Sequence, residues 1–283
     1  MYPWQAPSGR LSPLKTVAFV LLFVPAILVG DDWLNGYLGG RPIQEALRDI
    51  GGWTIRIVFL SLAVTPLRQI LKWQDLTLVR RMIGVAAFAY VVAHVVLYAA
   101  EEKFNLGTVA TEIVLRIYLL IGFMAVLGLA ALAVTSTDAM IRRMGTIWDR
   151  LHRIAYVVGI LGLVHFFMQS KADLWEPMVM AGLLVWLLGY RALAWAYGAR
   201  GLLPLVWAAV WTVMATALVA SGEAIYFWLA MGAPLQAVLE TNLSFDLGVR
   251  PAQLVFAISA GLTLIGAVRA VTSASSQRAF ARA

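Results

Sequence analysis

Long runs of hydrophobic residues, separated by short polar segments, dominate the chain. A helix that crosses about 30 Å of hydrocarbon needs about 20 such residues. Eight runs have roughly this length or more: 14–30, 53–71, 81–100, 111–135, 148–169, 176–197, 204–231 and 251–272. The longest segment outside them, 31–52, has room for at most a short amphipathic helix. The pattern predicts an all-α integral membrane protein without a separate nucleotide-binding or catalytic domain.

Composition supports this fold class and limits the chemistry. The chain of 283 residues is 61% hydrophobic and only 13% charged, whereas soluble domains are about 25% charged. Its lack of cysteine excludes disulfides, iron–sulfur clusters, thiolate-bound metals and covalently attached haem. Histidine must therefore carry any metal chemistry. We interpret the first run as a retained span, because it is long for a signal-peptide core and no clear cleavage site follows it.

The basic residues follow the membrane, which argues against nucleic acid as the reason for the net charge of +7. If the N-terminus lies in the cytoplasm, 15 of the 22 Lys and Arg residues fall on the cytoplasmic side. Because cytoplasmic loops carry an excess of Lys and Arg, we expect an inner-membrane protein with both termini in the cytoplasm. The seven on the outer side are Arg41, Arg48, Arg56, Lys103, Arg116, Lys171 and Arg250.

Two histidines are expected at the same depth. His94 lies 14 residues after Arg80 in the third span, and His165 lies 15 residues after Arg150 in the fifth. Both spans run from the cytoplasm outward, so a rise of about 1.5 Å per residue places each imidazole roughly 21 to 22 Å above its basic anchor. Two facing imidazoles in a helix bundle are a usual way to hold haem iron. The alternative is that they form hydrogen bonds between helices.

His152 marks a second level near the cytoplasmic surface. It precedes His165 by 13 residues, or about 20 Å, and the two differ by about 220° around an ideal helix. A bend, a π-bulge or a displaced second haem would be needed to make both point inward. Arg80 occupies the same inner level in the third span, where a second histidine might be expected. His152 could equally be a hydrogen-bonding residue near the interface.

Two further arginines are candidate cofactor contacts. Arg56 and Arg116 lie near the outer ends of the second and fourth spans, where they could pair with haem propionates or extend toward lipid phosphates.

Four segments together resemble a known family: TPLR at Thr65–Arg68, RRMIGVAAFAYVVAHVVLY at Arg80–Tyr98, LAVTSTDAM at Leu132–Met140 and WDRLHRIAYVVGILGLVHFF at Trp148–Phe167. They are similar to the haem-binding membrane subunits of periplasmic methionine-sulfoxide reductase systems, the MsrQ (YedZ) family, in the ferric-reductase-like transmembrane superfamily. The resemblance covers about residues 14–195.

The resemblance implies a domain organisation and a set of cofactors. It implies a six-helix ferric-reductase-like bundle that binds haem (14–200). The cytoplasmic N-terminus (1–13), the additional transmembrane helix pair (201–272) and the cytoplasmic tail (273–283) are predicted from the hydrophobic runs and the distribution of charge, and the helix pair lies outside the resemblance. His94, His152 and His165 match the haem histidines of the family. Arg80 stands where related NADPH oxidases have another histidine, which leaves open whether one or two b-type haems bind. FMN is also associated with the family.

The resemblance also implies an electron path. Electrons would enter from a cytoplasmic flavin reductase or the quinone pool, and leave to a periplasmic molybdopterin-containing subunit that reduces methionine sulfoxide. We therefore expect an electron-transfer subunit and not a complete enzyme. One alternative is a self-contained haem reductase of ferric iron or quinone. Another is a haem-free transporter, which the charges of Arg116 and Glu223 would suit.

Overall fold

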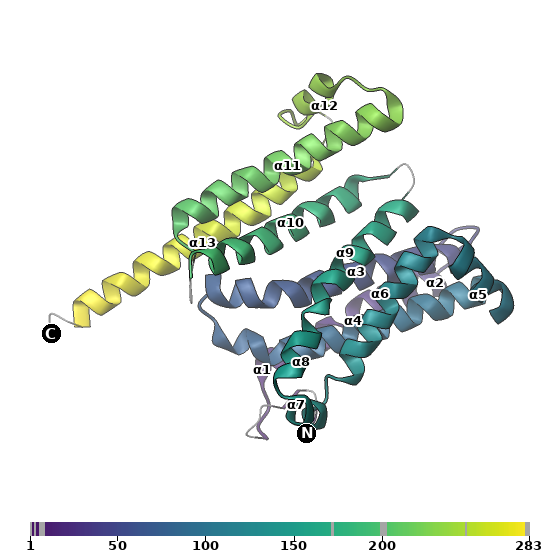
Figure 1. The fold of residues 1–283 in the computed structure, drawn as a ribbon, viewed down its shortest axis with the longest axis horizontal. Coiled ribbons are helices and arrows are strands. Elements are labelled where there is room, and N and C mark those ends of the chain that lie inside the picture. Colours follow the sequence, from purple (N-terminus) through teal and green to yellow (C-terminus); the bar gives the residue numbers. More distant parts are fainter. Residues whose placement is uncertain are drawn as a thin grey trace. The chain divides into compact units, whose positions relative to one another are not determined.

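The computed structural model describes residues 2, 4–5, 9–170, 173–198, 203–246 and 248–280, with the side chains of 273–280 left out, and helices dominate these ranges (Figure 1). Lys171, Arg200 and Arg282, which entered the predicted orientation, lie outside the described residues, as does the end of the predicted tail, 281–283. The helices are α1 (Pro13–Leu21), α2 (Val24–Leu34), α3 (Pro42–Ile70), the 3-10 helix η1 (Gln74–Leu76), α4 (Thr77–Glu101), α5 (Leu106–Leu115), α6 (Ile117–Val134), α7 (Asp138–Met144), α8 (Thr146–His152), α9 (Ile154–Gln169), α10 (Trp175–Ala196), α11 (Leu205–Met231), α12 (Leu235–Thr241) and α13 (Pro251–Phe280).

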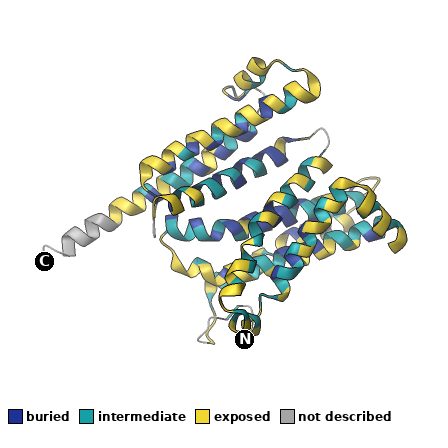
Figure 2. Ribbon diagram, viewed as in Figure 1, coloured by how far each residue is buried: buried dark blue, intermediate teal, exposed yellow. Residues whose placement is uncertain are grey.

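Eight helical segments of the described chain are long and apolar enough to cross a membrane, which confirms the predicted fold class. They are Pro13–Leu34, Pro42–Ile70, Gln74–Glu101, Ile117–Val134, Thr146–Gln169, Trp175–Ala196, Leu205–Met231 and Pro251–Thr272. Many of their exposed side chains are large and apolar, such as Ile27, Val213 and Leu264, and exposed positions run along most helices in Figure 2. Such surfaces suit contact with lipid.

Two spans differ from their predicted limits. The second begins at Pro42, so α3 has 29 residues and includes much of the polar segment that was expected to form at most a short amphipathic helix. The fourth is divided at Arg116, whose extended backbone (φ −103°, ψ 108°) separates α5 from α6. The charged residue therefore marks the start of the apolar span, which is shorter than the predicted 111–135.

The first span is broken between α1 and α2. Pro25 removes an amide from the helical ladder there. The Tyr90 hydroxyl of α4 donates to the Leu22 carbonyl at 2.7 Å and accepts from the Ala26 amide at 3.1 Å. It thus takes the place of the missing bond between residues four apart. An interrupted helix inside a membrane needs such a partner, because no water satisfies the freed backbone groups.

The chain divides into two compact units, and the first contains the three histidines. This unit comprises Met1–Val64 and Asp75–Gln169. Within it, α6 packs against α9, α4 and α5, and α1 packs against α4. The break between α8 and α9 falls at Arg153, between His152 and His165.

The second unit comprises Thr65–Gln74 and Ser170–Ala283, and α10, α11 and α13 pack together in it. Its core includes Val179, Val219, Ala252 and Val255. The predicted boundary between a haem-binding bundle and a helix pair at residues 200–201 lies outside the described residues and stays a prediction.

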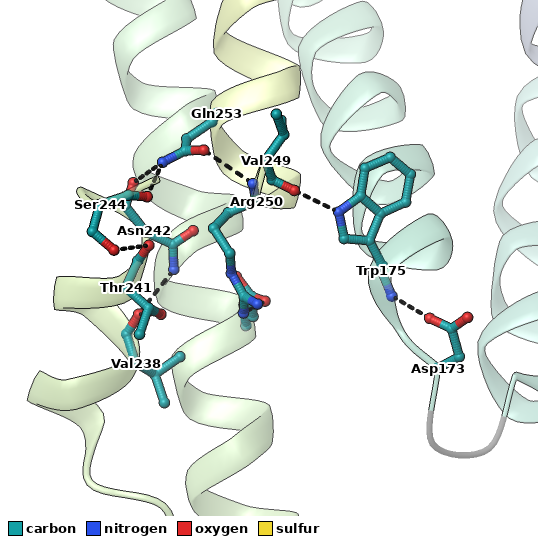
Figure 3. Close-up of polar contacts among 10 residues, drawn as sticks. Asp173, Trp175, Val238, Thr241, Asn242, Ser244, Val249, Arg250 and Gln253 are labelled. Atoms are coloured by element: carbon teal, nitrogen blue, oxygen red, sulfur yellow. Dashed lines mark hydrogen bonds and ion pairs between the residues drawn. The ribbon is translucent and has the colours of Figure 1, made fainter. Parts of the chain in front are cut away.

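A polar network lies where the loop after α12 meets the start of α13 (Figure 3). The Gln253 amide donates to the carbonyls of Asn242 and Ser244, at 3.0 and 2.8 Å. Arg250, just before α13, donates to the carboxylate of Glu223 in α11 at 2.5 Å. The ion pair compensates the charge of Glu223, which is buried. The intramembrane charge that suited a transporter therefore has a partner that joins two helices.

Candidate functional site

The imidazole of His94 is held between α4 and α3. Its Nδ1 lies 2.9 Å from the Leu47 carbonyl oxygen. Because a carbonyl only accepts hydrogen bonds, Nδ1 carries the proton and Nε2 of the neutral ring carries the lone pair. The ring also lies against Gly51: a Cβ on this glycine would be 2.8 Å from Cε1 and 2.9 Å from Nδ1.

The imidazole of His165 in α9 has a matching environment on α6. Its Nδ1 lies 2.8 Å from the Tyr118 carbonyl oxygen. A Cβ on Gly122 would be 2.7 Å from Nδ1 and 2.9 Å from Cε1. In this ring too, Nδ1 carries the proton and Nε2 remains to bind a metal.

The two rings lie next to each other, as their equal predicted depth suggested. Their centroids are 6.3 Å apart and their planes are inclined by 86°. A metal lies about 2.0 Å from an imidazole nitrogen, and about 1 Å more separates that nitrogen from the ring centroid, so two rings bound on opposite sides of one ion have centroids about 6 Å apart. The separation, the protonated Nδ1 atoms and the absence of side chains on the two glycines all fit an iron with two histidine ligands.

The described residues contain no group of three or more His, Cys, Asp or Glu side chains that could hold a metal ion. A porphyrin supplies the remaining ligands itself, so a pair of histidines suffices for haem.

The His94 and His165 environments repeat one spacing. Each histidine follows its carbonyl partner by 47 residues, and each glycine follows that partner by four. Leu47 and Gly51 thus correspond to Tyr118 and Gly122. Neither glycine and no repeat was predicted from the sequence, although the sequence LAVT also occurs twice, at 62–65 and 132–135. The equal spacing from glycine to histidine was the signal that could have revealed both.

Arg56 and Arg116 lie close to these histidine environments. The Arg56 guanidinium lies over the Trp53 ring, 4.6 Å from its centroid, and 3.4 Å from a Cβ built on Gly52, the neighbour of Gly51. Arg116 donates to the Tyr118 hydroxyl at 3.0 Å, and the carbonyl of this tyrosine binds His165.

A polar chain joins α4, the helix of His94, to the junction of α5 and α6. The Tyr98 hydroxyl, one helical turn after His94, donates to Glu112 at 2.7 Å. Arg116 donates to the other oxygen of the same carboxylate at 2.6 Å. Glu112 and Arg116 also line a shallow pocket of about 510 Å³ along α5. Sequence reasoning missed Tyr98 and Glu112 as members of this group.

His152 has a different environment from the other two histidines. Its ring stacks on Trp148, with centroids 3.8 Å apart, and its Nδ1 lies 3.1 Å from the Trp148 carbonyl oxygen. Its Nε2 lies 3.4 Å from the Ser136 hydroxyl. Both ring nitrogens therefore have protein partners, and the Ser136 contact would have to break before Nε2 could bind a metal.

The N-terminal ends of α4 and α7 are joined by an ion pair. Arg80 is exposed in the first turn of α4. The neighbouring Arg81 pairs with Asp138, and this contact lowers the pKa of the Asp138 carboxyl. Arg80 thus lies at the same end of α4 as this ion pair, with its own side chain exposed.

Comparison with known proteins points to one family. Residues 50–163 match the family described as ferric reductase like transmembrane component. The chain is 38% identical over 179 residues to a protein of Rhodospirillum rubrum, covering 62% of this chain and 86% of the relative. It is 36% identical over 191 residues to one from Azospira oryzae, covering 66% and 82%. Both relatives are named protein-methionine-sulfoxide reductase heme-binding subunit MsrQ. No solved structure matches the chain.

Proposed function

The chain belongs to the MsrQ family of ferric-reductase-like membrane proteins, and from this membership we propose that it is the haem-binding electron-transfer subunit of a methionine-sulfoxide reductase. His94 and His165 bind the iron of a b-type haem through Nε2. The observation that supports this assignment most directly is the pair of adjacent imidazoles, with ring centroids 6.3 Å apart and with Nδ1 of each ring bonded to a carbonyl. The relatives' names, which include haem binding, support the cofactor.

Bound haem supplies a one-electron redox centre, and the protein residues orient it. Hydrogen bonds from Nδ1 to the Leu47 and Tyr118 carbonyls fix the tautomer and raise the basicity of each Nε2. Arg56 and Arg116, next to the two histidine environments, pair with the propionates.

Electrons enter at the inner level in this proposal, from a cytoplasmic flavin reductase or from the quinone pool. His152 and the arginines near it, including Arg80, lie at this end of the unit. They hold either a second haem with one histidine ligand or the phosphate of FMN. Arginine supports the flavin alternative, because it binds phosphate by paired hydrogen bonds and does not deprotonate to become a metal ligand.

Electrons leave on the outer side to a periplasmic molybdopterin-containing catalytic subunit, which reduces methionine sulfoxide in oxidised proteins. The supporting observation is that His94 and His165 both lie in the C-terminal halves of their spans, which are the outer halves if the termini are cytoplasmic. The distribution of Lys and Arg supports an inner-membrane location with cytoplasmic termini. Reporter fusions after Lys72 and Arg143 should then behave as cytoplasmic, and fusions after Lys103 and Glu240 as periplasmic. The reverse pattern would contradict the electron path.

The ligand assignment is tested by optical and electron paramagnetic resonance spectra of purified protein. His94→Ala and His165→Ala should each abolish most of the low-spin b-type signal. Added imidazole should restore it, because the ligand can enter the space that the side chain leaves. His152→Ala is the matched control, because it removes a histidine that is not part of the pair. It should retain the low-spin signal of the haem bound by His94 and His165. Unchanged low-spin spectra in His94→Ala and His165→Ala would refute the assignment.

The partner assignment needs a separate measurement. Reduced protein should be reoxidised by the periplasmic reductase together with methionine sulfoxide. Reoxidation by a ferric chelate or a quinone, but not by the periplasmic reductase, would favour a self-contained haem reductase instead.

A further inference from the structure

We propose that Gly51 and Gly122 are positioning residues for the two haem ligands. Each glycine lets the backbone of its helix approach an imidazole closely, so that the carbonyl of the residue four positions earlier fixes Nδ1 and leaves Nε2 to the iron. This inference rests on the proposed function, because it concerns the same pair of histidines, and it assigns a role to residues that do not themselves touch the metal.

The approach is too close for any other amino acid. A Cβ on Gly51 would lie 2.8 Å from Cε1 of His94, and one on Gly122 would lie 2.7 Å from Nδ1 of His165. An ordinary contact begins at 3.4 Å, so each ring would have to move by about 0.6 Å or more. In both cases the atoms that the methyl group meets first are Nδ1 and Cε1.

The direction of this clash explains its expected effect. Nδ1 is the atom that donates to the Leu47 or Tyr118 carbonyl. A methyl group against this edge stretches or breaks the hydrogen bond and rotates the ring, and Nε2 moves with it. The carbonyl and the glycine lie four residues apart, on one face of α3 or α6, so helix geometry provides the bond and the space together.

At a glycine where a new methyl group has room, replacement by alanine should stabilise the fold. Alanine favours helix more than glycine does, so replacement should stabilise a helix wherever the methyl group has room. Gly84 in α4 is such a site: its Cβ would meet only the Ser61 hydroxyl, at 3.7 Å. Gly128 in α6 is crowded without a histidine, because its Cβ would lie 2.5 Å from Cγ2 of Val158 in α9.

These four glycines make a matched experiment. Gly51→Ala and Gly122→Ala should each weaken haem binding about 10- to 100-fold, the range seen when a partner of a metal-bound histidine is lost. Haem titration of the apoprotein measures the affinity, and electron paramagnetic resonance measures the low-spin signal, which should shift or convert to high spin. Gly84→Ala should match the parent protein in both. Gly128→Ala should lower the melting temperature while the spectrum of bound haem stays low-spin.

Imidazole provides a test that separates positioning from packing. In His94→Ala, added imidazole should bind in the space of the missing side chain and restore the low-spin spectrum. In Gly51→Ala/His94→Ala the new methyl group occupies part of that space, so the imidazole affinity should fall about 10-fold or more. Gly128→Ala/His94→Ala should bind imidazole as His94→Ala does, because the added methyl group is at another contact.

The outcomes distinguish this inference from the proposed function. If His94→Ala keeps the full low-spin spectrum, the ligand assignment fails, and the positioning role fails with it. If His94→Ala loses the signal but Gly51→Ala and Gly122→Ala match Gly84→Ala, the haem assignment stands and the positioning role is refuted. The same conclusion follows if Gly128→Ala changes the spin state as strongly as Gly122→Ala does, because general loosening of helix packing would then explain both.

Discussion

The ion pair between Glu223 and Arg250 should stabilise the second unit only as a pair. Replacing Arg250 by Met leaves a carboxylate whose side chain is only 4% exposed, with no compensating charge from Arg250. Replacing Glu223 by Leu leaves the Arg250 guanidinium, whose side chain is 20% exposed. The arginine can extend toward the interface, whereas the carboxylate cannot.

The difference in burial between the two side chains determines how strongly each single substitution should destabilise the fold. Breaking a buried ion pair by removing one partner costs about 3 to 5 kcal/mol. We expect Arg250→Met near the upper end of this range and Glu223→Leu near or below its lower end, because of the difference in exposure. Among the described residues, Oε2 of Glu223 and Nε of Arg250 have no hydrogen-bond partner. Such incomplete pairing rarely recovers the cost of desolvation, so the double variant should be within about 1 kcal/mol of the parent or more stable.

The assay is reversible unfolding of the purified protein in detergent, followed by helicity, for the parent, both single variants and the double variant. The coupling energy of this double-mutant cycle should exceed about 2 kcal/mol, since the residues are in direct contact. Single variants as stable as the parent would show that the pair is not desolvated. A double variant that loses the sum of the two single effects would refute the reasoning that each charge is costly only without its partner.

Three further predictions concern the first unit. Tyr90→Phe should cost about 1 to 3 kcal/mol in the free energy of unfolding, because two backbone groups at the break between α1 and α2 lose their partner inside the membrane; the matched assay is the same detergent unfolding. Arg81 lowers the pKa of Asp138 from 3.8, so their contact stabilises the fold above that pH and is lost as the pH falls through the lowered value. The difference in melting temperature between the parent and Asp138→Asn should therefore shrink on acidification, and a difference that grows would contradict the sign. His152→Ala should lose a flavin or high-spin haem component and should no longer accept electrons from a cytoplasmic donor. If it instead loses the low-spin signal assigned to His94 and His165, the assignment of the two histidine sites would have to be reversed.

The eight spans were predictable because hydrophobic runs of about 20 residues with few charges are long enough to cross a membrane as helices. The first and last residues of these spans were harder to predict. The polar residues between Pro42 and Trp53 hid the start of α3, although polar side chains at a helix end can reach the interface while the backbone continues its hydrogen bonds. The break between α1 and α2 depends on a hydroxyl from α4, and no local pattern near Pro25 reveals that partner.

The sequence was sufficient to predict that His94 and His165 lie at the same depth, but not which groups surround their imidazoles. A constant rise per residue was enough to place His94 and His165 at one level. The partners of their Nδ1 atoms are backbone carbonyls of Leu47 and Tyr118, and every residue has a carbonyl, so side-chain identity carries no signal there. Gly51 and Gly122 were equally hidden, since glycine is frequent in transmembrane helices. Only the repeated spacing from glycine to histidine distinguishes them.

The angular mismatch between His152 and His165 did carry information about the backbone. An ideal helix would turn the two imidazoles about 220° apart over 13 residues, so a continuous helix is hard to reconcile with two inward-facing rings. The structure interrupts the helix at Arg153, directly after His152. His152 is therefore the last residue of α8, separated from α9 by one residue that keeps helical backbone angles (φ −69°, ψ −21°), and its ring stacks on Trp148 one turn earlier. The partners of His152, Trp148 and Ser136, therefore differ from the carbonyl and glycine of α6 that contact His165, so the two histidines lie in separate environments on one helical segment.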